Sequence, residues 1–131
     1  MFDKIWYNSL NSPLFSPPTW VFAPIWAFLY FLIIISFVLY FLKDKKNKGL
    51  GYFYFFTQLL FNFLWPFIFF KYKNILGGLI IIILLDIFLI LTIKRFFKVS
   101  LLSVWLLLPY LFWMIFATYL NFGYFILNKF I

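Results

Sequence analysis

Histidine and cysteine are both absent from the 131 residues of this chain. Without them the protein has no disulfide, no thiolate nucleophile, and neither of the side chains that most often hold zinc or haem iron. Acidic residues are scarce as well, with three Asp and Glu against eleven Lys and Arg. The sequence therefore offers no acid–base or nucleophile–base arrangement for hydrolytic chemistry, and we expect no cofactor and no metal site.

Charged residues make up only 11% of the chain, whereas 67% of it is hydrophobic. No soluble domain of this size could bury so much apolar surface, so its solvent must be lipid. The net charge of +8 comes from short clusters between apolar runs, as in the loops of membrane proteins. A nucleic-acid-binding protein would instead spread its cations along one exposed face, so we expect no nucleic-acid partner.

The apolar runs predict an all-α integral membrane protein, with one transmembrane helical bundle over residues 1–131. Four spans are expected, at about residues 18–42, 50–70, 75–93 and 100–127. Residues 1–16 contain Asn, Ser and Pro among aromatic residues, which predicts an interfacial loop. Seven of the eleven cations lie in the connections 43–49 and 94–98, which places those connections in the cytoplasm. The expected location is a bacterial cell membrane.

The last span carries one polar and aromatic helical face. Its members recur at spacings of three and four: Tyr110, Trp113, Ala117, Asn121 and Tyr124. A face meant only for lipid would be uniformly aliphatic, and polar atoms at membrane depth turn inward because hydrocarbon offers them no partner. We therefore expect this helix to form one wall of an aromatic, weakly polar pocket.

Two earlier spans carry shorter stripes of the same kind. The first span has aromatic residues four apart, at Phe22, Trp26 and Tyr30. Core packing is the simpler interpretation of that stripe taken alone. The second span places two amides and an indole on one face, at Gln58, Asn62 and Trp65. These amides either bond neighbouring helices or line a cavity and bind a polar ligand edge, and the sequence leaves both interpretations open.

Asp86 lies close to the middle of the third span. An ionised carboxylate at this depth is costly, so we expect it to be protonated or hydrogen-bonded to a neighbouring helix. A functional ion or proton site and a structural interhelix bond are about equally supported, because no second buried charge can pair with it. In the same span, Gly77 and Gly78 would allow two helices to approach closely.

Three clusters of residues together resemble the TspO/MBR family, the tryptophan-rich sensory proteins and translocator proteins. They are Pro17 to Trp26 (which follows Trp6-Tyr7), Gln58-Asn62-Trp65, and Pro109 to Asn121. Their order and separation match the family's motifs over nearly the whole chain. The last cluster reads Pro-Tyr-x-x-Trp-x-x-Phe-Ala-x-x-Leu-Asn, which is long and specific.

The resemblance implies a receptor or sensor that binds a porphyrin, another tetrapyrrole or a sterol-like molecule in an intramembrane pocket. Without histidine, a metal-free porphyrin fits better than axially ligated haem. The ligand-binding residues that it implies are Trp20, Phe22, Trp26, Tyr30, Asn62, Trp65, Trp113, Ala117 and Asn121. Two alternatives stay open: a light- or oxygen-dependent porphyrin-degrading enzyme, and a small-molecule transporter that uses Asp86.

This chain departs from the family in the number of its helices. Family members have five spanning helices, and the first precedes the Trp-Tyr pair, which here is Trp6-Tyr7. We therefore expect the family's first helix to be missing from this chain, either lost or encoded upstream of Met1. A bundle of four helices would leave one pocket wall open to lipid unless a second copy closed it, so a homodimer is a further expectation.

Overall fold

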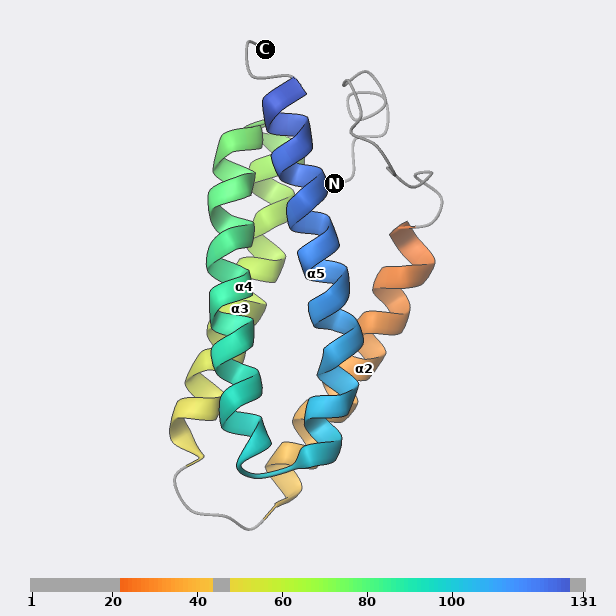
Figure 1. The fold of residues 1–131 in the computed structure, drawn as a ribbon, viewed down its shortest axis with the longest axis vertical. Helices are drawn as coiled ribbons and strands as arrows, with labels where there is room; N and C mark the ends of the chain where they lie inside the picture. Colours follow the sequence, from red (N-terminus) through yellow and green to blue (C-terminus); the bar gives the residue numbers. More distant parts are fainter. Residues whose placement is uncertain (1–21, 44–47, 128–131) are drawn as a thin grey trace.

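A computed structural model describes residues 22–43 and 48–127, and Figure 1 shows them as an elongated helical bundle. The elements in chain order are α2 (Phe22–Leu42), α3 (Gly49–Pro66), the short π-helix η2 (Phe67–Lys71), α4 (Ile75–Phe97) and α5 (Leu101–Leu127). In the described residues, α2, α4, α5 and the continuous α3–η2 segment are each long and apolar enough to cross a membrane. The expected all-α transmembrane bundle is confirmed.

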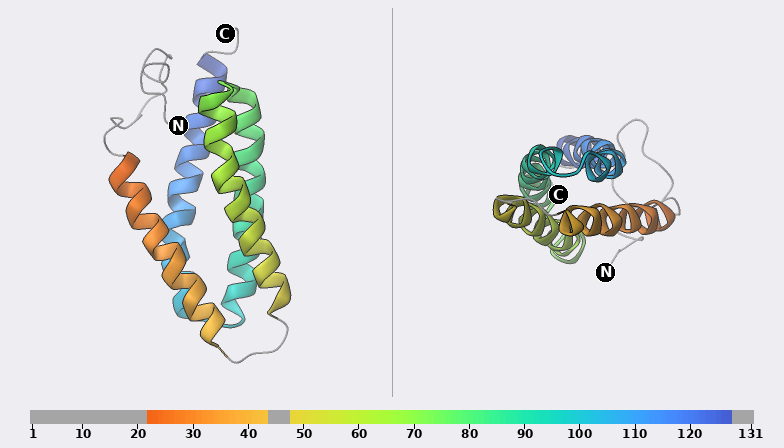
Figure 2. Two further views of the ribbon diagram at one scale, coloured as in Figure 1. Left: turned by 180° about the vertical axis from the view of Figure 1, so that it is seen from behind. Right: turned by 90° about the horizontal axis from the view of Figure 1, so that it is seen from below.

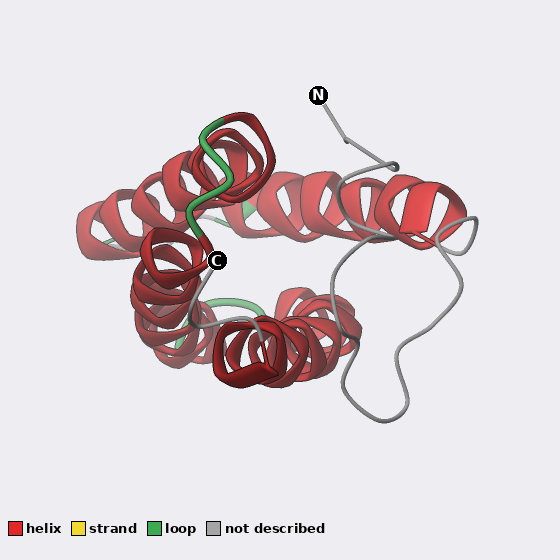
Figure 3. Cartoon of the chain, turned by 90° about the horizontal axis from the view of Figure 1, so that it is seen from above, coloured by secondary structure: helices red, strands yellow, loops and turns green. Residues whose placement is uncertain are grey.

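The helices pack in the spatial order α3, α4, α5, α2. At one end, lowest in Figure 1, α2 ends, α3 begins and α4 passes into α5. Towards the other end α2 leans away from the remaining helices, as the two end-on views also show (Figure 2, Figure 3). We call the lower end the basic end, because Lys43, Lys48, Lys94, Arg95 and Lys98 lie there, next to the ends of α2, α3 and α4.

Two serines hold α2 against α5 in the half of the bundle nearer the basic end. Ser36 Oγ donates to the carbonyl of Ser103 at 2.8 Å, and Ser103 Oγ donates back to the carbonyl of Ser36 at 2.9 Å. Both serines are fully buried. Small hydroxyl side chains let two backbones approach closely in a membrane while their polar atoms bond across the interface. This contact therefore holds α2 close to α5 in that half of the bundle.

Aromatic packing joins α2, α3 and α4 at the basic end. The rings of Tyr40 and Phe96 stack with centroids 3.9 Å apart and planes within 10°. The Tyr40 hydroxyl donates to the carbonyl of Lys48 at 2.9 Å. A Cβ at Gly51 would lie 2.2 Å from that hydroxyl oxygen, so only glycine leaves room for the Tyr40 ring.

Pro66 changes the helix type within the second span. Proline has no N–H to donate to the carbonyl four residues earlier, which disfavours a regular α-helix at this point. The chain continues as η2, and the N–H of Tyr72 bonds the carbonyl of Phe67 at 3.1 Å. The helix of the third span, α4, runs to Phe97, so Lys94 and Arg95 form its last turn.

Large apolar side chains cover the outside of the bundle. Phe31 is 61% exposed, Trp105 62% and Phe112 67%, and exposed Ile and Leu side chains accompany them on every described helix. Water would oppose such a surface, whereas lipid tails solvate it. The exposed surface therefore agrees with the span assignment, and the protein is an integral membrane protein.

Candidate functional site

A chain of hydrogen bonds at membrane depth links α2, α3 and α5. The hydroxyl of Tyr30 donates to Asn62 Oδ1. Asn62 Nδ2 donates to Tyr110 Oη at 2.8 Å, and the Tyr110 hydroxyl donates to Gln58 Oε1 at 2.8 Å. Asn62, Tyr110 and Gln58 are buried. The two amides and two phenols thus form one directional network, which we call the amide–phenol network.

The network ends in a donor that the fold leaves unused. Gln58 is 0% exposed, and its Nε2 has no hydrogen-bond partner among residues 22–43 and 48–127. An amide N–H₂ group carries two donors, and burying them without a partner costs about 1–3 kcal/mol. Such a group is retained where packing demands it or where an acceptor from a ligand can reach it.

A second amide lies closer to the opposite end of the bundle. Trp65 Nε1 of α3 donates to Asn121 Oδ1 of α5 at 2.9 Å, and Asn121 Nδ2 donates to the carbonyl of Ile75 at 3.1 Å. Asn121 is 2% exposed. One asparagine therefore ties together α3, α4 and α5, and it fixes the indole of Trp65 by its N–H group.

A glycine makes room for this second amide. A Cβ at Gly78 would lie 2.9 Å from Phe69 Cδ2 and 3.2 Å from Asn121 Oδ1. Any larger residue would have to displace one of those side chains. The expected close approach at Gly77 and Gly78 is thus present, and at Gly78 it positions Asn121.

Half-buried aromatic rings flank both amides. Trp26 packs on Tyr30 with ring centroids 5.5 Å apart, and Trp65 stacks on Phe69 at 4.8 Å. On α5, Trp113 lies 5.6 Å from Phe116. All three indoles are half-buried.

Comparison with known proteins supplies the family. The TspO/MBR family model matches residues 1–127. The chain is 46% identical to "Tryptophan-rich protein TspO" of Archaeoglobus fulgidus, over 95% of this chain and 81% of that protein. It is 38% identical to "Tryptophan-rich protein TspO" of Chlorobaculum tepidum, over 94% and 79%. It is also 33% identical to the human "Translocator protein", over 89% and 71%.

The chain belongs to the TspO/MBR family. The resemblance drawn from the three sequence clusters is thereby confirmed. The four candidate spans among the described residues, and TspO relatives that include bacterial proteins, support the expected location in a bacterial membrane.

The structure places most of the residues expected to bind ligand in this TspO/MBR protein. Trp20 lies outside the described residues, and Phe22 begins α2 with a side chain that is not described. The remaining seven lie on three helices: Trp26 and Tyr30 on α2, Asn62 and Trp65 on α3, and Trp113, Ala117 and Asn121 on α5. Hydrogen bonds join Tyr30 to Asn62 and Trp65 to Asn121. The indoles and Ala117 pack against one buried apolar cluster.

Two residues outside the expected set complete the amide–phenol network. Tyr110 shares the polar face of α5, and Gln58 precedes Asn62 by one turn of α3, so both spacings were visible in the sequence. What the spacing could not show is that Tyr110 bonds both amides. In the second cluster, Asn121 donates to the backbone carbonyl of Ile75. No residue type in the sequence could have indicated that acceptor, because every residue has a backbone carbonyl.

Asp86 of α4 bonds a neighbouring helix, in agreement with one of the two expectations for it. Thr118 Oγ1 of α5 lies 2.5 Å from Asp86 Oδ2 and 2.8 Å from the carbonyl of Met114. The Thr118 hydroxyl donates to Asp86 Oδ2, so the carboxyl of α4 accepts a hydrogen bond from α5. Asp86 Oδ1 is buried without a partner among the described residues.

Proposed function

We propose that this TspO/MBR protein is a receptor or sensor for a planar, largely apolar molecule with a polar edge, such as a metal-free porphyrin or another tetrapyrrole. The carrying observation is the convergence of Asn62, Gln58 and Tyr110 from two helices, next to half-buried indoles. Indole faces suit stacking on a flat ring, and a few amide groups suit its polar edge.

The donor at Gln58 Nε2 gives this proposal its polar contact. A pyrrole nitrogen or a carboxylate could accept from it and remove the cost of burying it unpaired. A sterol-like ligand is the runner-up at the same site, because its single hydroxyl could also accept that bond. The nine residues that the resemblance implies as ligand-binding remain the proposed binding surface, and Gln58 and Tyr110 are added to them.

Quenching of intrinsic tryptophan fluorescence tests the proposal. Protoporphyrin titrated into the purified protein in detergent should quench emission with a micromolar midpoint. Trp113→Phe combined with Asn62→Ala should raise that midpoint about tenfold, which corresponds to about 1.4 kcal/mol. Trp105→Phe is the matched control, because Trp105 is exposed on the lipid-facing side of the same helix. Midpoints are compared rather than amplitudes, since each variant lacks an indole.

Quenching no stronger than in protein-free micelles would contradict porphyrin binding. An equal rise of the midpoint in Trp105→Phe would show that quenching reports partition into the micelle. Circular dichroism of each variant separates loss of binding from loss of fold.

Illumination and flux experiments separate the two alternatives. A porphyrin-degrading enzyme should lower porphyrin absorbance under light faster than protein-free micelles do. A transporter should move its substrate across liposome membranes, and Asp86→Asn should abolish that flux. Asp86 gives the transport alternative its one specific support, since its Oδ1 is buried without a partner among the described residues.

We also propose a homodimer, in which a second copy packs beside α2 and covers the side of the ligand site where α2 leans away from the other helices.

A further inference from the structure

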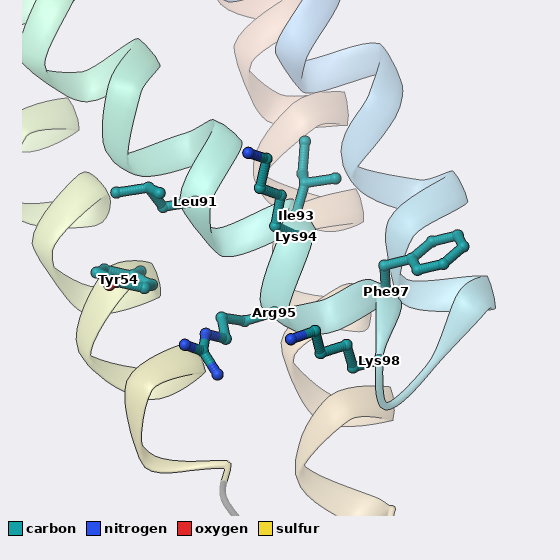
Figure 4. Close-up of a pocket in the computed structure, with 7 residues that line it drawn as sticks. All are labelled: Tyr54, Leu91, Ile93, Lys94, Arg95, Phe97 and Lys98. Atoms are coloured by element: carbon teal, nitrogen blue, oxygen red, sulfur yellow. The ribbon is translucent and has the colours of Figure 1, made fainter.

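A hollow of about 490 Å³ opens between α3 and the last turns of α4, at the basic end of the bundle. Its lining combines three cations, Lys94 and Arg95 in the last turn of α4 and Lys98 directly after it, with the phenol of Tyr54 on α3 and apolar side chains such as Leu91. Figure 4 shows Arg95 extending from α4 toward α3, with the amine of Lys98 pointing to the same side. Tyr54 lies one turn of α3 before Gln58, so the hollow lies on the basic-end side of the amide–phenol network.

The cations of this hollow are not neutralised by the part of the chain that the structure describes. Their side chains form no hydrogen bond or ion pair there, whereas the nearby Lys48 amine donates to the carbonyls of Phe41 and Lys43 at 3.0 and 2.7 Å. The one carboxylate among residues 22–43 and 48–127, Asp86, lies nine residues before Arg95, or about 13 Å along the helix.

Helix electrostatics explain only part of this arrangement. The C-terminus of α4 carries roughly half a negative charge, which favours cations in its last turn. Three cations exceed that half charge by a wide margin. Most of the positive potential in the hollow is therefore available to an external anion.

We propose that this hollow binds the phosphate-bearing headgroup of an anionic phospholipid. Arg95 presents a planar fork that matches phosphate oxygens, and Tyr54 adds a phenol from the facing helix. Basic pockets between transmembrane helices at their cytoplasmic ends suit such headgroups. Leu91 lines the hollow on its apolar side, and Ile87 and Ile90, 48% and 45% exposed, continue that surface deeper along α4. An acyl chain would cover this surface, and a free phosphate would leave it uncovered.

Native mass spectrometry in neutral detergent tests the proposal with three probes: phosphatidylglycerol, phosphatidylcholine and inorganic phosphate. Phosphatidylglycerol should bind most tightly. Arg95→Gln with Lys98→Gln should weaken phosphatidylglycerol binding about thirtyfold, and Lys98→Gln alone, at an exposed position, about fivefold. Lys71→Gln with Lys73→Gln removes the same charge from the opposite end and should leave the affinity unchanged.

Equal binding of phosphatidylglycerol and phosphatidylcholine would overturn the proposal. Unchanged phosphatidylglycerol binding in Lys98→Gln would overturn it too, and this exposed substitution leaves the fold intact. Saturable binding of inorganic phosphate with no preference among lipids would assign a free-phosphate site and refute the lipid headgroup. Porphyrin quenching should stay unchanged in these variants, so this test and the ligand-binding test fail independently.

Discussion

Asn62 of α3 and Tyr110 of α5 are joined by a buried hydrogen bond of 2.8 Å, in which the amide nitrogen donates to the phenol oxygen. The same phenol donates to Gln58 Oε1, so a single hydroxyl satisfies groups on two successive turns of α3. One hydroxyl thus holds α5 against α3, and Asn62, Gln58 and Tyr110 are all buried.

Removing that hydroxyl should be costly. Tyr110→Phe leaves Asn62 Nδ2 and Gln58 Oε1 without their partner, and each buried unpaired group costs about 1–3 kcal/mol. We expect the free energy of unfolding in detergent to fall by at least about 1 kcal/mol, and thermal or denaturant unfolding measures it. Tyr72→Phe, which removes an exposed hydroxyl outside the helices, is the control and should be neutral. Equal stability of the two variants would mean that the network contributes nothing.

The contact between Trp65 and Asn121 should give a measurable coupling energy. A double-mutant cycle with Trp65→Phe and Asn121→Leu isolates the hydrogen bond from the loss of packing. Interhelical side-chain bonds in membranes contribute about 0.6–1.7 kcal/mol, so we expect a coupling in that range. The cycle of Trp105→Phe with Asn121→Leu pairs residues without this bond and should be additive. Additivity in both cycles would contradict a direct bond at Trp65.

The sequence was sufficient to predict which face of α5 turns inward. Of the predicted face, Tyr110, Asn121 and Tyr124 are buried in the structure, and Trp113 and Ala117 are half-buried. Periodicity works here because a polar side chain at membrane depth has one sterically and energetically acceptable direction, toward other helices.

Periodicity within one helix does not say how far a neighbouring helix is shifted along it. The pairing of Trp65 with Asn121 depends on that shift, and so does the bond from Asn121 to the carbonyl of Ile75, a backbone group with no sequence signal. The π-helical turn after Pro66 was also not predicted, because proline excludes a bond without specifying which arrangement replaces it.

Gly78 should tolerate no side chain. A Cβ there meets Phe69 at 2.9 Å and Asn121 at 3.2 Å, and a branched side chain adds further overlap, so Gly78→Val should cost about 1–3 kcal/mol of stability. It should also weaken porphyrin quenching, because Asn121 and with it Trp65 must shift. Gly49→Ala is the matched control, since a Cβ at Gly49 meets nothing within 4 Å. Comparable losses in both variants would show that helix-wide backbone effects, rather than the local contact, set the cost.

Thr118 should matter more to stability than its hydroxyl bond to the preceding turn implies. Thr118→Val removes the bond to the carbonyl of Met114 and the partner of Asp86 Oδ2, which leaves a buried carboxyl oxygen unpaired. Thr57→Val removes the same kind of bond, to the carbonyl of Phe53 at 2.7 Å, with no carboxyl attached. We expect Thr118→Val to lower the free energy of unfolding by about 1–3 kcal/mol more than Thr57→Val does.

Asp86→Asn completes that comparison, because an amide oxygen can replace the carboxyl oxygen as the acceptor from the Thr118 hydroxyl. Its stability should therefore lie within about 1 kcal/mol of the parent's. A large loss in Asp86→Asn, or equal losses in the two threonine variants, would mean that the carboxyl is held by something other than Thr118. Because Asp86→Asn keeps the fold in this scheme, a loss of liposome flux in the same variant would report on ion or proton movement and not on unfolding.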